Sequence, residues 1–196
     1  MNQWESINLR DYETHMRSKK VFQLQTLNMI MADQMKYKPD SVAVLGAAGG
    51  NGFEHLHSAH TIYAIDINED YLRHCGKKYT YLGDKLKLIQ CDLHQAVLPS
   101  CDLLICNLII EYLGIESFAK LLERSQFKLA SCVIQKNCGN SFVSASKTAT
   151  KLEPLNSLHH DIEAEELIKR LGRPVVLQKN YALPNNKEFV RIDFND

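Results

Sequence analysis

Residues 42–56, VAVLGAAGGNGFEHL, join a short β-branched run to a cluster of small residues and then to a helical start. Glycine adds no Cβ, so a strand that ends in such a turn lets backbone N–H groups and a helix N-terminus approach a ligand closely. Twenty residues after Gly46, a second apolar run, TIYAID, ends on Asp66. A carboxylate at the tip of the next strand is placed to bind the hydroxyls of a ribose. The two features together predict a site for a nucleoside-containing cofactor.

Apolar runs and helical patterns alternate on both sides of this stretch. The strand runs are almost continuously apolar, as strands buried on both faces are, and buried parallel strands need covering helices on both sides. The pattern predicts strands at 41–46, 61–66, 86–90, 102–107 and 131–136, and helices at 51–59, 69–80, 115–128 and 161–171.

The last residues predict a hairpin. Two extended runs, 174–183 and 187–194, flank the turn Pro184-Asn185-Asn186, and a short polar turn between two strands gives an antiparallel pair. The expected fold is therefore α/β: a doubly wound, mostly parallel seven-stranded sheet, with one antiparallel strand from the C-terminal hairpin and helices on both faces.

Two further segments flank the predicted sheet. Residues 1–40 are helical in pattern, and we expect them to form an N-terminal cap over the carboxyl edge of the sheet, ahead of one domain spanning 41–196. Residues 137–160 are rich in Ser, Thr, Asn and Lys. A long irregular segment in a compact domain is typically a lid or a binding loop, or else disordered.

Composition narrows the possible partners. The formal net charge of the 196 residues is zero, so no basic field favours nucleic acid. No apolar stretch approaches the ~20 residues needed to cross a bilayer. The six cysteines include no C-x-x-C pair, and we expect free thiols in a reducing, cytoplasmic compartment.

The order of these motifs, from about residue 41 onward, resembles that of class I (Rossmann-like) S-adenosylmethionine-dependent methyltransferases. In that family the first loop typically reads acid-x-Gly-x-Gly-x-Gly. The matching positions here are Val44, Gly46, Ala48 and Gly50, so the acid is missing and the middle glycine is replaced by alanine. The Gly-Gly that often precedes the fifth strand is also absent, with 128–130, Lys-Leu-Ala, in its place.

The resemblance implies S-adenosyl-L-methionine as cofactor, S-adenosyl-L-homocysteine as product, and direct displacement of the methyl group by a small-molecule acceptor. Asp66 matches the carboxylate on the ribose, Asp92 matches the acid beside the adenine amino group, and Asn107 ends the fourth strand, DLLICN, which faces the transferable methyl group. The implied cofactor-binding residues are Gly46, Ala47, Ala48, Gly50, Asp66, Ile67, Asp92, Leu93 and Asn107.

The residues that would act on the acceptor are less marked in the sequence. A base is needed only where the nucleophile carries a proton of high pKa. The catalytic candidates that follow the fourth strand are Asn107, Glu111 and Tyr112. The candidates on the substrate side, from the N-terminal helix and the end of the fifth strand, are Tyr12, His15, Met16 and Asn137.

Structural roles compete with each of these assignments. Asp66 and Asp92 could cap the segments that follow them, and Asn107 could end its strand through its own side-chain hydrogen bonds. An apolar helix face accounts for Tyr12 and Met16 as core residues. Histidines 55, 57 and 60 have no carboxylate or cysteine at ligand spacing, so no metal site is expected.

Two other functions remain open at this point. The loop also fits a nicotinamide-dependent oxidoreductase of the short-chain type, but the Tyr-x-x-x-Lys pair that such enzymes share occurs here only as Tyr81 and Lys85, before the third strand. The second alternative is a relative that binds a nucleoside without catalysis and acts as an interaction module. The stretch 107–110, Asn-Leu-Ile-Ile, lacks the Asn-Pro-Pro-aromatic signature of many enzymes that methylate amino groups of nucleic acids, which weighs against a nucleobase acceptor.

Overall fold

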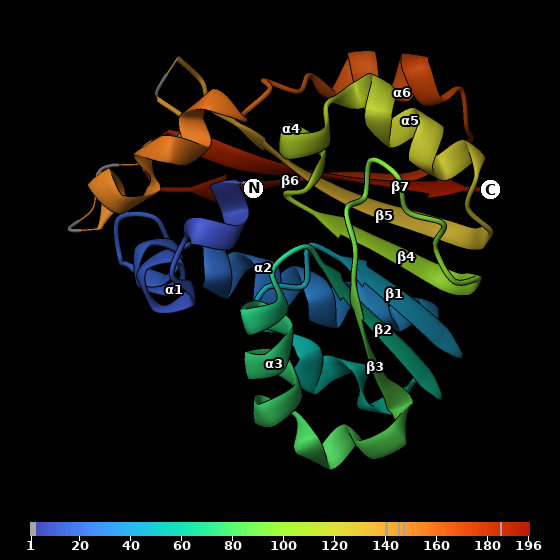
Figure 1. Ribbon diagram of the computed structural model, residues 1–196. Helices are drawn as coiled ribbons and strands as arrows, with labels where there is room; N and C mark the ends of the chain where they lie inside the picture. The colour runs from blue at the N-terminus through green and yellow to red at the C-terminus, as the bar shows by residue number, and fades with distance from the viewer. Residues whose placement is uncertain (1–2, 140, 145, 147, 185) are drawn as a thin grey trace.

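A seven-stranded sheet organises the chain in the computed structural model, which describes residues 3–139, 141–144, 146, 148–184 and 186–196 (Figure 1). The strand order is β3-β2-β1-β4-β5-β7-β6. The strands are β1 (Ser41–Leu45), β2 (Thr61–Asp66), β3 (Leu86–Gln90), β4 (Cys101–Asn107), β5 (Phe127–Lys136), β6 (Val175–Leu183) and β7 (Lys187–Asn195).

Strand direction confirms the predicted fold class. β1 pairs in parallel with β2 and β4, and the parallel pairing continues to β3 on one side and β5 on the other. β7 runs antiparallel to both β5 and β6, as expected for a C-terminal hairpin. Of the predicted turn 184–186, Asn185 lies outside the described residues. The strand order reverses between β1 and β4, and open α/β sheets bind ligands at the carboxyl ends of such a pair.

Both faces of the sheet are covered by helices (Figure 1). Alternate residues of β1 face opposite sides: Leu45 packs in one apolar cluster with Phe118, while Val44 packs in another with Leu72. This explains why the run is apolar at every position. The helices are α1 (Leu9–Arg17), α2 (Gln23–Gln34), α3 (Glu69–Lys78), α4 (Ile110–Leu113), α5 (Ile115–Glu123) and α6 (Ala164–Leu171).

Several predicted boundaries are wrong. The helix expected at 51–59 is only a 3-10 helix, η3 (Phe53–Ser58), because Gly50 and Gly52 have φ of +75° and +88° and keep the preceding turn out of helical geometry. The helix expected at 115–128 ends at Glu123, and 127–130 belong to β5 instead. Residues 129 and 130 pair with β4, so sheet pairing decides this boundary over helical periodicity. α6 begins at Ala164 rather than at 161.

Residues 140, 145 and 147 of the predicted irregular segment 137–160 lie outside the described residues, and the described part is more regular than its composition predicts. A nine-residue 3-10 helix, η5 (Ala149–Ser157), lies within it. Leu152 and Leu155, three residues apart on one face, are buried against Ile7 of the N-terminal segment. Trp4, in the 3-10 helix η1 (Gln3–Ser6), packs against the same cluster. Two segments from opposite ends of the chain therefore cover the same side of the sheet edge.

A buried ionic network joins α2 to the antiparallel strand β7. Arg191 and Asp193 are 1% and 0% exposed, and the Nε and Nη2 atoms of Arg191 donate to the two carboxylate oxygens of Asp193 at 2.9 and 2.6 Å. The Nη1 atom of Arg191 donates to Asp33 at 2.8 Å. The hydroxyls of Tyr37 and Ser131 donate to Asp193 at 2.8 and 2.5 Å.

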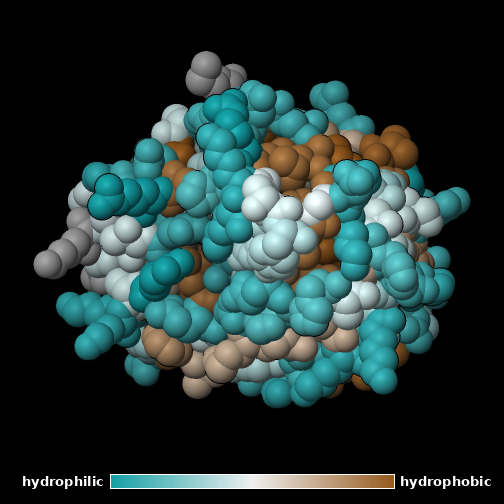
Figure 2. Space-filling model, turned by 90° about the horizontal axis from the view of Figure 1, so that it is seen from below, coloured by the Kyte–Doolittle hydropathy of each residue, from teal (hydrophilic) through white to brown (hydrophobic). Residues whose placement is uncertain are grey.

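The surface agrees with the balanced composition. The face seen from below in Figure 2 is mainly hydrophilic, with apolar side chains gathered in patches between the polar ones. All six cysteines are free thiols, and four of them are buried. Among the described residues, no helix is both long enough and apolar enough to cross a membrane.

Candidate functional site

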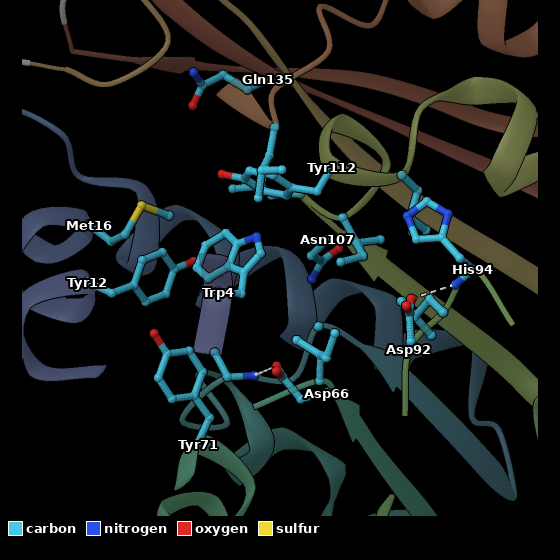
Figure 3. A pocket seen from close by; sticks show the side chains of 18 of the residues that line it. Trp4, Tyr12, Met16, Asp66, Tyr71, Asp92, His94, Asn107, Tyr112 and Gln135 are labelled. Carbon is cyan, nitrogen blue, oxygen red and sulfur yellow. Dashed lines mark hydrogen bonds between the residues drawn. The ribbon is translucent and has the colours of Figure 1, made fainter. Parts of the chain in front are cut away.

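A cavity opens at the carboxyl edge of the sheet, where β1 and β4 diverge (Figure 3). We call it the main cavity. It holds about 1030 Å³ of space, including the open solvent at its mouth. Its lining residues are Trp4, Tyr12, Met16, Gln23, Gly46, Ala48, Asp66, Ile67, Tyr71, Cys91, Asp92, Leu93, His94, Asn107, Leu108, Ile109, Tyr112, Leu113, Gln135, Phe142 and Leu158.

The glycine-rich loop after β1 forms the floor of the main cavity. Gly46 has a φ of +65°, and a Cβ at this position would lie 3.0 Å from Cδ1 of Ile109, so a side chain here would be both strained and crowded. Ala48 also has a positive φ, +45°, although it carries a Cβ. Its position is that of the middle glycine in the methyltransferase loop pattern, which explains why glycine is usual there.

Asp66, at the tip of β2, holds this loop in place. One carboxylate oxygen accepts the backbone N–H of Ala48 at 2.8 Å, and the other accepts the N–H of Asn68 at 2.9 Å. Burial raises the pKa of Asp66, and these backbone donors oppose the rise. Each oxygen keeps a further lone pair, so the carboxylate can shape the loop and still accept a bond from a ligand. The capping and ligand-binding roles considered for Asp66 are therefore compatible.

Asp92 lies on the loop after β3 and lines the same cavity. Its Oδ1 atom accepts the backbone N–H of His94 at 3.0 Å, so Asp92 caps a turn, and its side chain is exposed (Figure 3). Ile67 and Leu93, which follow the two acids, also line the cavity and supply apolar surface between them.

Asn107 ends β4 and lines the cavity opposite the loop. Its Oδ1 atom accepts a hydrogen bond from Nε2 of Gln34 at 3.1 Å, and the same Nε2 lies 2.8 Å from the Ser131 hydroxyl. The buried ionic network thus extends through Ser131 and Gln34 to Asn107. Leu108 follows with a φ of +56°, an unusual conformation for leucine that redirects the chain into α4. Backbone strain of this kind is concentrated at functional sites.

Aromatic side chains enclose the other end of the cavity. The ring of Trp4 meets Tyr12 and Tyr112 edge to face, with centroids 5.6 and 4.9 Å apart (Figure 3). Tyr112 in turn meets Phe142 at 6.0 Å, and Phe142 stacks on His159 at 3.6 Å. The charged carboxylates in the lining are Asp66 and Asp92, and none of the described lining residues is lysine or arginine.

Glu111 does not line the main cavity. Its side chain is 1% exposed, and its Oε1 atom accepts the backbone N–H of Gln135 at 2.7 Å. Its Oε2 atom is buried with no hydrogen-bond partner among the described residues. Burial raises the pKa of Glu111 to about 7. Glu111 therefore lies behind the cavity wall, where it contacts Gln135, a residue of the lining.

The melting temperature of Glu111→Gln relative to the parent should be several degrees higher at pH 8 than at pH 5. The folded-state pKa is about 7 and the ordinary value is 4.5, so the stability contributed by protonation is complete below 4.5 and is lost as the pH rises through 7. Glutamine carries no charge at either pH. Thermal unfolding of both proteins at the two pH values measures the effect, and equal differences at both would contradict it.

Other predicted residues also lie outside the main cavity. Gly50 is packed against Cys75 and Tyr79, and Ala47 is 5% exposed beneath the loop. The His15 ring bonds the Ser146 hydroxyl at 2.7 Å. The Asn137 side chain accepts from Gln135 at 2.6 Å and donates to Asp161 at 3.0 Å. Tyr81 and Lys85, the pair relevant to an oxidoreductase, are likewise absent from the lining.

Sequence reasoning did not select several lining residues, notably Trp4, Tyr71, Gln135 and Phe142. Gln135 lies near the carboxyl end of β5, and Tyr71 lies in the first turn of α3, so their positions at the sheet edge could have been recognised. Trp4 and Phe142 reach the cavity through packing between distant segments, which no local pattern reveals.

Comparison with known proteins supports the fold through structure alone. No protein-family model matches the sequence, and no curated protein matches it. Many solved structures match the structure of this chain. The magnesium protoporphyrin IX methyltransferase ChlM from Synechocystis PCC 6803 with bound SAH is 12% identical, with a TM-score of 0.66, over 92% of this chain and 86% of that one. The N-methyltransferase NodS from Bradyrhizobium japonicum WM9 is 10% identical, with a TM-score of 0.63, over 88% and 95%.

The chain has the class I methyltransferase fold. A third similar structure is Trm5 of Methanocaldococcus jannaschii in complex with adenosine, with 17% identity and a TM-score of 0.59 over 84% of this chain and 46% of that one. The methyltransferase fold places the glycine-rich loop, Asp66, Asp92 and Asn107 at one edge of the sheet, as their order in the sequence predicts.

Proposed function

We propose that this protein is an S-adenosyl-L-methionine-dependent methyltransferase that acts on a small-molecule acceptor. The observation that carries the proposal is the convergence on one cavity of Gly46, Ala48, Asp66, Asp92 and Asn107, in a chain with the class I methyltransferase fold. Similar structures contain SAM, SAH or adenosine, according to their descriptions.

The residues present fit the nucleoside part of this cofactor. Asp66 would accept hydrogen bonds from the ribose hydroxyls, and Asp92 would accept a hydrogen bond from the adenine amino group. Ile67 and Leu93 supply the apolar surface that a flat base needs. Gly46 takes the positive φ that turns the loop at the cavity floor, a conformation that glycine adopts without strain.

The cofactor supplies a methyl group on a positively charged sulfur, which a nucleophile can take directly. The task of the protein is then to align the acceptor and to exclude water. Asn107 is held by Gln34 at the cavity wall, and Tyr12, Met16 and Tyr112 line the cavity and cover it with apolar surface. Glu111, behind the wall, would act by supporting Gln135 rather than as a base on the acceptor.

The aromatic end of the main cavity supports a small-molecule acceptor. Trp4, Tyr12, Tyr112 and Phe142 offer flat apolar faces, and such walls with few polar groups are typical of small-molecule sites. Recognition of a phosphate backbone depends on lysine and arginine, and the described lining contains neither. These features favour a small molecule over nucleic acid, although one similar structure is a complex of aTrm5 with tRNA.

Isothermal titration of the purified protein with S-adenosyl-L-methionine, S-adenosyl-L-homocysteine and NADH tests the proposal. We expect the two sulfur nucleosides to bind with micromolar affinity and NADH to give no heat. Binding of NADH alone would show that the protein is an oxidoreductase rather than a methyltransferase. If none of the three ligands gives a heat of binding, the remaining function is that of an interaction module without a cofactor.

A further inference from the structure

A second, smaller cavity adjoins the glycine-rich loop, and we call it the loop cavity. It shares Tyr12, Gly46, Ala48 and Asn107 with the main cavity, so the two spaces meet at the loop. Its lining is otherwise mostly apolar, and among the described lining residues Glu13 is the single acidic side chain. Glu13 comes from α1, which lies outside the sheet.

The carboxylate of Glu13 rests directly on the loop. A Cβ added to Gly49 would lie 2.4 Å from Oε1 of Glu13 and 3.2 Å from the Leu9 side chain, so the missing side chain of Gly49 makes room for this acid. Arg17, one helical turn further on, lies 3.7 Å from Glu13 and is 61% exposed. Such an exposed pair is weak, so much of the negative charge of Glu13 remains available to the cavity.

Position 44 lacks the acid that the methyltransferase loop pattern usually has there. Val44 is 4% exposed and packs in the apolar cluster under the loop, and it lines the loop cavity together with Glu13. One cavity therefore holds both the valine that replaces the usual acid and a carboxylate delivered by a different element.

We propose that Glu13 binds the α-ammonium group of the amino-acid part of S-adenosyl-L-methionine, and so replaces from α1 the acid missing at Val44. The inference rests on the proposed function. A buried ammonium group needs a charged acceptor, and in the loop cavity Glu13 is the residue that offers one. The nucleoside-binding acids, Asp66 and Asp92, belong to the lining of the main cavity and remain free to hold the other end of the molecule.

Two ligands that share the nucleoside separate this contact from the rest of the site. S-adenosyl-L-homocysteine carries the amino-acid part, and 5′-methylthioadenosine lacks it. In Glu13→Gln we expect the affinity for S-adenosyl-L-homocysteine to fall by roughly 10- to 100-fold, the loss expected on removal of a charged hydrogen bond. The affinity for 5′-methylthioadenosine should stay within about twofold of the parent value. Calorimetric titration of both proteins with both ligands gives the four affinities.

Each result of these titrations either supports or overturns the role of Glu13. Glu165→Gln, which removes an exposed acid on α6, is the control and should bind both ligands like the parent. Equal losses for the two ligands in Glu13→Gln would mean that Glu13 only shapes the loop, and no loss would mean that it makes no contact; either result overturns the inference. If the parent protein binds neither ligand, the proposed function fails first, and the inference fails with it.

Discussion

Replacing Asp66 with alanine should weaken the binding of S-adenosyl-L-homocysteine by roughly 10- to 100-fold, or about 1–3 kcal/mol. The carboxylate accepts the backbone N–H groups of Ala48 and Asn68, so the substitution removes the ribose acceptor and leaves two backbone donors without their partner. The loop that forms the cavity floor then loses its fixed position. Calorimetric titration of the parent and the variant measures the difference.

Asp102 provides a matched control at the opposite edge of the sheet. It also accepts two backbone N–H groups, those of Asp40 and Ser41, both at 2.9 Å. Asp102→Ala should therefore cost some stability while leaving ligand affinity unchanged. If Asp66→Ala binds the ligand as tightly as the parent, Asp66 at the end of β2 does not contact the ribose.

Replacing Asp193 with alanine should lower the free energy of unfolding by about 3–5 kcal/mol, the cost of leaving a buried charge without its partner. Arg191 is 1% exposed and donates to Asp193 through two nitrogen atoms. After the substitution, Asp33 at the edge of the network is the carboxylate among the described residues that still pairs with it. Urea unfolding of the parent and the variant measures the loss.

Two further variants sharpen this prediction. Glu69→Ala removes one partner of an exposed pair with Arg73 and should change stability by less than about 0.5 kcal/mol. The double substitution Arg191→Met, Asp193→Leu removes both buried charges and should recover a large part of the loss. If Asp193→Ala unfolds at the same urea concentration as the parent, the network does not contribute to stability.

The sheet and the cofactor edge were predictable because their signals are local. Strands buried on both faces must be apolar at every position, which is how β1 reads, and an acid directly after such a strand must lie at the carboxyl edge. The loop, Asp66, Asp92 and Asn107 therefore meet once the sheet forms. Their contacts with a ligand stay predictions.

The acceptor end of the cavity was not predictable in the same way. Trp4 and Phe142 lie far apart in the sequence and each contacts Tyr112. Trp4 also packs on the cluster of Ile7 and Leu152, which come from equally distant segments. Glu111 is buried in α4, which follows directly after Leu108 with its positive φ. Neither contact between distant segments nor a single unusual backbone angle leaves a periodic pattern in the sequence.

The position of Trp4 has a practical consequence for every experiment above. The chain contains one tryptophan, and it lines the main cavity in edge contact with Tyr12 and Tyr112. Its fluorescence emission therefore comes from one place in the molecule and depends on what surrounds the indole there. A ligand that displaces water from this ring should change the intensity and wavelength of the emission, so the protein carries an intrinsic optical reporter of its own cavity.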